Sequence, residues 1–226
     1  QLLLIYKEPD LSTTITVAGV FCVLIFVSGL SYRIVFGVLA VLVPVAVIFV
    51  SVLIQPDQQG GGNYQLKRVY AWLRPDEYPD EARQQQNSIK AIGSGQLYGK
   101  GLNNDDVGSV KNGNFISEAQ TDFIFAVAGE ELGFLGCCII VLLEFLIALE
   151  CLLIGRRAKV LSGTLIGCGM SALVFFQTFI NISVTTGLIP NTGITLPFVS
   201  YGLTSLVSFC IGIGLVLNVG LQTRKY

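Results

Sequence analysis

Long apolar runs separated by polar stretches dominate the pattern of this chain. Five runs have about the length that crosses a bilayer as a helix: residues 13–29, 34–54, 123–154, 163–187 and 201–221. A polar section, residues 55–121, separates the second run from the third. The pattern predicts an all-α fold, a polytopic transmembrane helix bundle with about five full spans and one long loop, in a single integral membrane domain over residues 1–226.

The third run is longer than a simple crossing needs. About thirty helical residues at ~1.5 Å each exceed a hydrocarbon core of ~30 Å. We therefore expect its first turns, with Glu130 and Glu131, to stand above the lipid or to face a cavity. On an ideal helix Glu130 lies about 12 Å below Asp122 and about 80° around the axis. Three glycines are spaced so that another helix can approach closely: Gly129, Gly133 and Gly136.

The long polar section is not uniform along its length. Residues 55–63 are rich in Gln and Gly, which is typical of a linker. Residues 69–73 contain Tyr and Trp, which favour the membrane interface, and residues 84–92 predict a short amphipathic helix that ends at Gly93-Ser94-Gly95. Because a loop this long in a compact protein is usually functional or disordered, its aromatic residues and glycines favour a functional loop.

Basic residues in the short connections predict the orientation. Arg33 lies between the first two runs, residues 156–159 carry three basic residues between the third and fourth, and Arg224 and Lys225 follow the fifth. An up-and-down path places all three sites on one side, which is then cytoplasmic together with the C-terminus. The section 55–121 and the loop 188–200 are then extracytoplasmic.

The composition limits which side chains could take part in catalysis. Charged residues make up 13% of the chain, about half of the ~25% in soluble domains, and a net charge of −1 does not indicate a nucleic-acid partner. There is no His, so acid–base work falls to carboxylates, Lys or Tyr, and the six Cys lie in apolar runs as small hydrophobic residues. The chain begins at Gln1 with the end of an apolar segment, so we expect an N-terminal portion to precede it.

Asp122 is the main candidate for chemistry. Ionisable groups are costly in hydrocarbon unless they face a polar cavity or a partner, and this carboxylate stands at the mouth of an apolar run. It could serve catalysis, cap the helix, or pair with a loop lysine. Lys90 and Lys100 flank a Gly-rich turn whose amides could hold a diphosphate, although both lysines could equally be solvated. Nucleotide binding is excluded because Gly101 stands where a P-loop needs Ser or Thr.

Several blocks together resemble the SEDS family of bacterial cell-wall proteins, of the FtsW, RodA and SpoVE type. They occur in the family's order: 8–13 (EPDLST), 86–95 (QNSIKAIGSG), 98–101 (YGKG), 121–127 (TDFIFAV), 130–133 (EELG) and 186–202 (TGLIPNTGITLPFVSYG). The chain departs from the family's usual pattern at three places: Ser12, residues 116–117 and Leu203.

The resemblance implies the C-terminal part of a ten-helix protein, with about the first four helices absent. It implies a peptidoglycan glycosyltransferase that polymerises lipid II on the outer face of the bacterial cytoplasmic membrane during division, elongation or sporulation. The expected partner is a class B penicillin-binding protein, a transpeptidase. This fragment alone would not complete the substrate cavity.

Within the resemblance, Asp122 matches the family's essential aspartate, and we assign it as the general base. Lys90, Lys100 or a divalent cation are candidates to stabilise the departing diphosphate, and no other cofactor is evident. The residues predicted to bind substrate lie in or beside the matching blocks: Lys90, Ser94, Lys100, Glu118, Glu130, Ser200 and Tyr201.

Two other functions stay open. A lipid II flippase or other transporter would need polar groups at successive depths, and Glu144, Glu150 and the polar residues of the fourth run would suit such a path. The alternative for that polar stripe is hydrogen bonding between helices. A noncatalytic scaffold for division or elongation partners is the third hypothesis.

Overall fold

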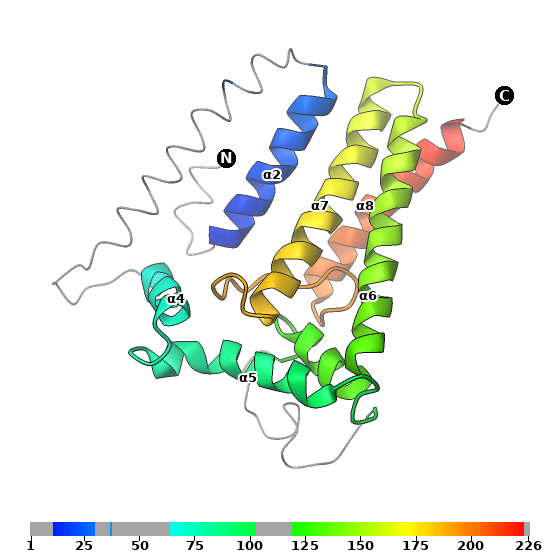
Figure 1. The fold of residues 1–226 in the computed structure, drawn as a ribbon. Helices are drawn as coiled ribbons and strands as arrows, with labels where there is room; N and C mark the ends of the chain where they lie inside the picture. The colour runs from blue at the N-terminus through cyan, green and yellow to red at the C-terminus, as the bar shows by residue number, and fades with distance from the viewer. Residues whose placement is uncertain (1–10, 30–36, 38–63, 103–118, 224–226) are drawn as a thin grey trace.

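The computed structural model describes residues 11–29, 37, 64–102 and 119–223. Within these residues all regular structure is helical (Figure 1): α2 (Leu11–Val27), α4 (Tyr64–Leu73), α5 (Pro79–Gly95), α6 (Ile124–Arg156), α7 (Leu161–Thr185) and α8 (Leu203–Thr223). The predicted all-helical fold class is therefore confirmed for the part of the chain that the structure describes.

Three helices are long and apolar enough to cross a membrane: Ile124–Arg156, Leu161–Thr185 and Leu203–Gln222. They match the third, fourth and fifth predicted runs closely. The first predicted run corresponds to α2, whose apolar stretch Thr13–Val27 is shorter. The second run, 34–54, lies outside the described residues, and the predicted count of five spans stays a prediction.

The antiparallel pair of α6 and α7 forms the centre of the bundle, with α2 packed on α7 and α8 beside both (Figure 1). The two central helices come close because Gly155 and Gly167 face each other without side chains. A buried cluster then fills the space between α6, α7 and α8: Ala148, Cys151, Met170, Val174, Phe209 and Val216. Burial of these apolar groups holds the three helices together.

Helices α4 and α5 lie at the end of the bundle where α6 begins, and α5 crosses that end (Figure 1). The sequence predicted only residues 84–92 as helix here, whereas α5 runs from Pro79 to Gly95. Proline suits a first helical position, and Asp80 and Glu81 in the first turn favour the helix dipole. The buried positions recur every three or four residues, which lays one face of α5 on the bundle: Ala82, Gln85, Ser88, Ala91 and Gly95.

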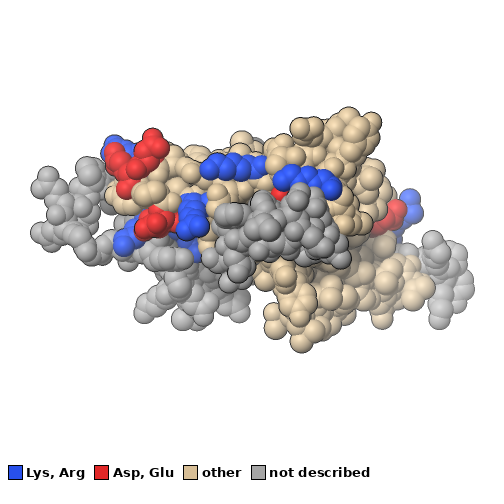
Figure 2. Space-filling model, turned by 90° about the horizontal axis from the view of Figure 1, so that it is seen from below, with Lys and Arg blue, Asp and Glu red and all other residues tan. Residues whose placement is uncertain are grey.

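Charged side chains mark the two ends of the molecule. The end that carries α4 and α5 exposes acidic and basic residues (Figure 2): Lys67, Arg74, Asp76, Glu77, Asp80, Glu81, Arg83, Lys90 and Lys100. The connection between α6 and α7, at the opposite end, exposes Arg156, Arg157 and Lys159. Apolar side chains are exposed on the helices between these ends, as expected for surfaces that face lipid.

Helix α6 is broken at Gly133, whose φ of 68° and ψ of −167° are not helical. A break leaves backbone groups without helical partners, which is costly in an apolar medium. Residues 96–101 supply the missing partners. The amides of Lys100 and Gly101 donate to the carbonyls of Glu130 (2.9 Å) and Glu131 (3.1 Å). In return the amides of residues 134 and 135 donate to the carbonyls of residues 96 and 97, at 2.9 and 3.3 Å.

This arrangement corrects the ideal-helix geometry predicted for the third run. Helix α6 begins at Ile124 with Phe123 at the capping position, so Asp122 lies in the segment before the helix and is not its cap. The break at Gly133 also separates the first turns from the remaining span. The offset of about 12 Å between Asp122 and Glu130 assumes a helix that already includes residue 122, and it does not apply because α6 begins at Ile124.

Gly95→Ala tests how tightly α5 is seated on α6. A Cβ at residue 95 would collide with the carbonyl oxygen of Gly129, whereas one at Gly93 would meet nothing within 4 Å. We expect Gly95→Ala to destabilise the protein by about 1–3 kcal/mol through overpacking. Gly93→Ala, the matched control, should be neutral or slightly stabilising because alanine favours helix.

The measurement is the thermal unfolding midpoint of the detergent-solubilised protein. Equal midpoints for the two alanine variants would contradict the close contact between α5 and α6.

Candidate functional site

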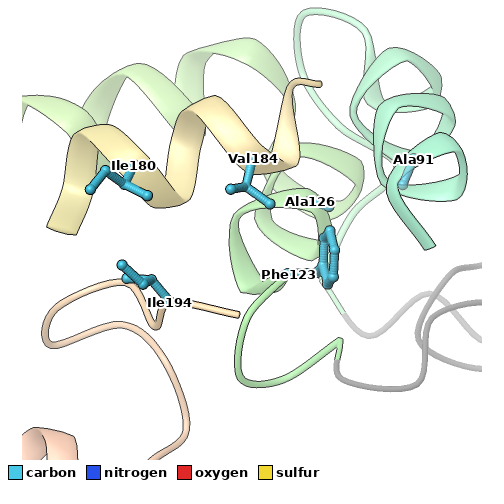
Figure 3. Close-up of a cluster of buried hydrophobic side chains, with 6 residues drawn as sticks. All are labelled: Ala91, Phe123, Ala126, Ile180, Val184 and Ile194. Atoms are coloured by element: carbon cyan, nitrogen blue, oxygen red, sulfur yellow. The ribbon is translucent and has the colours of Figure 1, made fainter. Parts of the chain in front are cut away.

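The candidate site lies where α5, the start of α6, the end of α7 and the loop after α7 meet. A buried apolar cluster joins these four elements (Figure 3): Ala91, Phe123, Ala126, Ile180, Val184 and Ile194. Phe123 is only 1% exposed and directly follows Asp122. Its burial fixes the backbone next to the candidate catalytic carboxylate.

Asn181 of α7 ties two irregular segments together. Its Nδ2 donates to the carbonyl of Asp122 at 2.8 Å and to that of Ile194 at 2.7 Å. The residue is 1% exposed, and both carbonyls belong to non-helical backbone. One buried amide therefore supplies the donors that a regular helix would otherwise provide, and holds Asp122 against the loop after α7.

Ser200 makes a second connection between the same segments. Its Oγ accepts from the amide of Leu196 at 2.7 Å and donates to the carbonyl of Thr121 at 2.6 Å. The amide of Tyr201 donates to the carbonyl of Gln120 at 2.9 Å. Ser200 is buried in these bonds and positions the Asp122 segment, whereas the Tyr201 side chain is exposed at the same end of the molecule.

Side chains of α4 and α5 bind carbonyls of the last turn of α7 and of the loop that follows it, where the regular helical bonding ends. Gln85 Nε2 donates to the carbonyls of Val184 (2.8 Å) and Ile189 (2.7 Å). Ser88 Oγ donates to that of residue 185 at 2.8 Å, and Trp72 Nε1 to that of residue 187 at 2.8 Å. Both polar-section helices are thus fixed on the end of the bundle that carries Asp122.

Asp122 and Arg68 approach the same glycine. A Cβ built on Gly193 would lie 3.3 Å from Asp122 Oδ2 and 3.9 Å from Arg68 Nη1. Arg68 Nη1 also donates to the carbonyl of Asn191 at 3.4 Å. Asp122 and Arg68 are both half-buried, so a carboxylate and a guanidinium stand together at an accessible, partly desolvated position.

The sequence did not single out Arg68, although a weak signal was present. Arg68 and Trp72 are four residues apart, so they share a face of α4, and both contact the loop after α7. Arg and Trp on one face of an amphipathic helix indicate that this face contacts another part of the protein. The loop that it contacts is more than a hundred residues away in the chain, and spacing does not reveal such a partner.

Lys100 forms an ion pair with Glu130. The Nζ to Oε1 distance is 2.8 Å, and the Glu130 side chain is 3% exposed against 33% for Lys100. The amide of Gly99 donates to the carbonyl of Gly95, and those of Lys100 and Gly101 donate to α6. These three amides are therefore engaged within the protein, and the turn predicted to hold an anion joins α5 to α6.

The remaining residues predicted to bind substrate are Lys90, Ser94 and Glu118. Lys90 and Ser94 are exposed on α5, and Ser94 Oγ donates to the carbonyl of Ala91 at 2.8 Å. Glu118 lies outside the described residues. In the described ranges no three Cys, Asp or Glu side chains lie close enough to share a metal ion. Substrate contacts and a divalent cation stay predictions.

An apolar groove of about 710 Å³ runs along α6 beside the site. It is lined from α5, from α6 and from the end of α7, with Phe125, Gly129, Phe134, Val141 and Phe145 along its length. Phe125 is three residues from Asp122, and Phe145 lies far down the apolar span. The groove can accommodate a hydrocarbon chain whose polar end is at the Asp122 end of the bundle.

A family model described as a cell cycle protein, of the FtsW, RodA and SpoVE type, matches residues 1–225. The chain belongs to this family. The resemblance drawn from the sequence blocks is confirmed, and family membership together with three apolar helices supports a membrane location.

Curated relatives agree with this assignment. Stage V sporulation protein E of Bacillus subtilis is 38% identical over 98% of this chain and 57% of its own length. Peptidoglycan glycosyltransferase MrdB of Escherichia coli is 37% identical, with 96% and 56% covered. Probable peptidoglycan glycosyltransferase FtsW of Nitrosomonas europaea is 35% identical, with 98% and 55% covered. The chain thus spans a little over half the length of these relatives.

A solved structure has the same fold. It comes from work on the structural coordination of polymerization and crosslinking by a peptidoglycan synthase complex, and it matches with a TM-score of 0.74 at 28% identity. The match covers 100% of this chain and 60% of that chain. The helical membrane fold of the family is therefore present in the described residues.

A double-mutant cycle tests the ion pair between Lys100 and Glu130. Lys100→Ala should destabilise the protein by about 3–5 kcal/mol, because a buried carboxylate loses its countercharge. The double variant Lys100→Ala with Glu130→Gln should recover part of this loss, since no charge is then left buried. Chemical unfolding in detergent of the wild type, the two single variants Lys100→Ala and Glu130→Gln, and the double variant completes the cycle. Strictly additive effects would show that the pair is not coupled.

Proposed function

We propose that the full-length protein containing this chain polymerises lipid II, a disaccharide peptide on undecaprenyl diphosphate, into glycan strands. Asp122 is the general base of this glycosyl transfer. The observation that carries the proposal is Asp122 at the end of an apolar bundle, where Asn181 binds its backbone carbonyl and Ser200 that of Thr121. Relatives in Escherichia coli and Nitrosomonas europaea bear the name peptidoglycan glycosyltransferase, which supports it.

The reaction needs one proton acceptor and one stabilised leaving group. A hydroxyl oxygen of one sugar forms a bond to the anomeric carbon of the donor sugar, and its proton passes to the Asp122 carboxylate. The bond between that carbon and the diphosphate oxygen breaks, and its electron pair leaves with the polyprenyl diphosphate. Proton transfer to a positioned base typically contributes 10²–10⁴-fold to the rate.

The apolar groove along α6 supports a lipid-linked substrate. An undecaprenyl chain is hydrocarbon, and the groove is lined almost entirely by apolar residues along α6 from Phe125 to Phe145. A chain in this groove places its diphosphate at the end of the bundle where Asp122 lies. Anchoring the remote part of a substrate in this way holds the reacting groups in place.

The orientation and the partner form part of the proposal. With the α6–α7 connection cytoplasmic, the basic residues 156–159 obey the positive-inside rule, and Asp122 faces the outside, where glycan strands grow. A class B penicillin-binding protein is the proposed partner that cross-links them. The similar solved structure comes from a complex that couples polymerization to crosslinking, which supports this pairing.

Lipid transport is the second candidate function, and one observation favours it. Glu144 lies within the apolar span of α6 at 3% exposure, and its Oε2 makes no hydrogen bond among the described residues. An ionisable residue at such a depth often marks a substrate or proton path. Glu150, by contrast, is exposed near the end of α6, so the described residues do not form a continuous acidic path.

Asp122→Asn in the full-length protein tests the catalytic assignment. The amide keeps the size of the side chain and cannot accept the proton, so glycan polymerisation from labelled lipid II should fall by about 10²–10⁴-fold. Asp76→Asn, an exposed carboxylate between α4 and α5, is the matched control and should retain full activity. Both variants should unfold at the temperature of the wild type.

Full activity of a correctly folded Asp122→Asn variant would remove Asp122 from the mechanism. Movement of lipid II across vesicle membranes by the wild type, without polymerisation, would favour the transporter.

A further inference from the structure

We propose that Glu144 and Thr178 form a proton-binding site inside the membrane span, where the Glu144 carboxyl is neutral and donates a hydrogen bond to Thr178. This inference concerns the middle of the bundle and does not depend on glycan polymerisation. It gives Glu144 a role other than that of a step in a transport path.

The two residues face each other across the two central helices. Glu144 lies four residues before Ala148 on α6, and Thr178 lies four residues after Val174 on α7, so each shares a face with a member of the buried cluster between α6, α7 and α8. The Thr178 hydroxyl contacts the Glu144 carboxyl. Glu144 and Thr178 are 3% and 8% exposed, so both polar groups are closed off from solvent.

Both polar groups have unmet hydrogen-bonding capacity. Glu144 Oε2 and Thr178 Oγ1 are buried atoms that make no hydrogen bond to the described residues. An ionised carboxylate in an apolar surrounding needs a cation or several donors, and one hydroxyl supplies a single donor. Protonation gives the carboxyl a donor of its own, which Thr178 Oγ1 accepts once the side chains turn toward each other. One bound proton therefore satisfies both atoms.

The described helices offer Glu144 no nearby countercharge. Helices α2, α7 and α8 contain no Asp, Glu, Lys or Arg, and their titratable groups are cysteines: Cys22, Cys168 and Cys210. Helix α5 packs on α6 before the break at Gly133. On α6 itself, Arg156 stands about 18 Å further along the axis, and Glu150 is exposed. A proton is the cation that this site can hold without a further ligand.

Thermal unfolding of the full-length protein in detergent tests the site through its pH dependence. The folded state holds a proton on Glu144 that an unfolded chain releases above about pH 4–5, so the site's contribution to stability falls as the pH rises. Glu144→Gln keeps a neutral side chain and removes this loss. We expect the midpoint of Glu144→Gln to rise relative to the wild type by about 3–8 °C between about pH 5 and pH 8.

Glu150→Gln is the matched control, because it makes the same substitution at an exposed position of α6. Its difference from the wild type should be the same at both pH values. A Glu144→Gln midpoint that stays below the wild type at the higher pH would show that the carboxylate is charged and paired, and this would overturn the proton site. An unchanged difference between the two pH values would overturn it as well.

Two further measurements identify the bound cation. Dicyclohexylcarbodiimide is an apolar reagent that adds to a protonated carboxyl, so mass spectrometry of membranes treated at neutral pH should find the adduct on Glu144. Glu77, which is exposed and paired with Arg74, should carry none. An unmodified Glu144 would contradict the proposal. A wild-type midpoint that is higher in Na⁺ than in choline, with no such difference in Glu144→Gln, would replace the proton by a metal cation.

Discussion

The candidate chemistry depends on two hydrogen bonds from the buried side-chain amide of Asn181. These bonds fix the end of the bundle where Asp122 lies. In an apolar surrounding, irregular backbone is tolerated only where its carbonyls and amides find partners. The segment before α6 and the loop after α7 are both irregular, and Asn181 binds a carbonyl of each. Ser200, Gln85 and Ser88 meet the same requirement nearby. Side chains that bind the backbone carbonyls of Asp122 and Thr121 thus hold the segment before α6 in place.

The same constraint explains the break in α6. A span interrupted at Gly133 would expose carbonyls and amides to lipid, and the turn after α5 supplies their partners. Lys100 adds an ion pair to the buried Glu130. Helix α5 is therefore bound to α7 at one end and to α6 at the other. These bonds fix α5 and the turn at residues 96–101 on the end of the bundle that carries Asp122.

Local patterns in the sequence were sufficient to predict the three helices that are long and apolar enough to cross a membrane. The apolar runs beginning at residues 123, 163 and 201 matched α6, α7 and α8 because hydrophobic length is a local property. The start of α5 was missed because its first turn, with Asp80 and Glu81, is polar and shows no apolar periodicity. The interruption at Gly133 was missed because a glycine in an apolar run predicts close packing as readily as a break.

The candidate site was predictable only in part. Asp122 stood out as an acid at the mouth of an apolar run inside a matching block. Arg68 did not, because its contact with Asn191 joins residues 123 positions apart. The turn containing Lys100 had the composition of an anion site, yet its amides bind α6. Composition indicates which chemistry a residue can perform, and only the fold shows which partner it has.

A structure of the full-length protein bound to lipid II and an inert analogue of the growing strand is the most direct test of Asp122 as the base. We expect an Asp122 carboxylate oxygen within about 2.6–3.2 Å of the acceptor hydroxyl, with the donor diphosphate on the far side of the anomeric carbon. An acceptor hydroxyl seated against another carboxylate such as Glu130, with Asp122 turned away, would contradict the assignment.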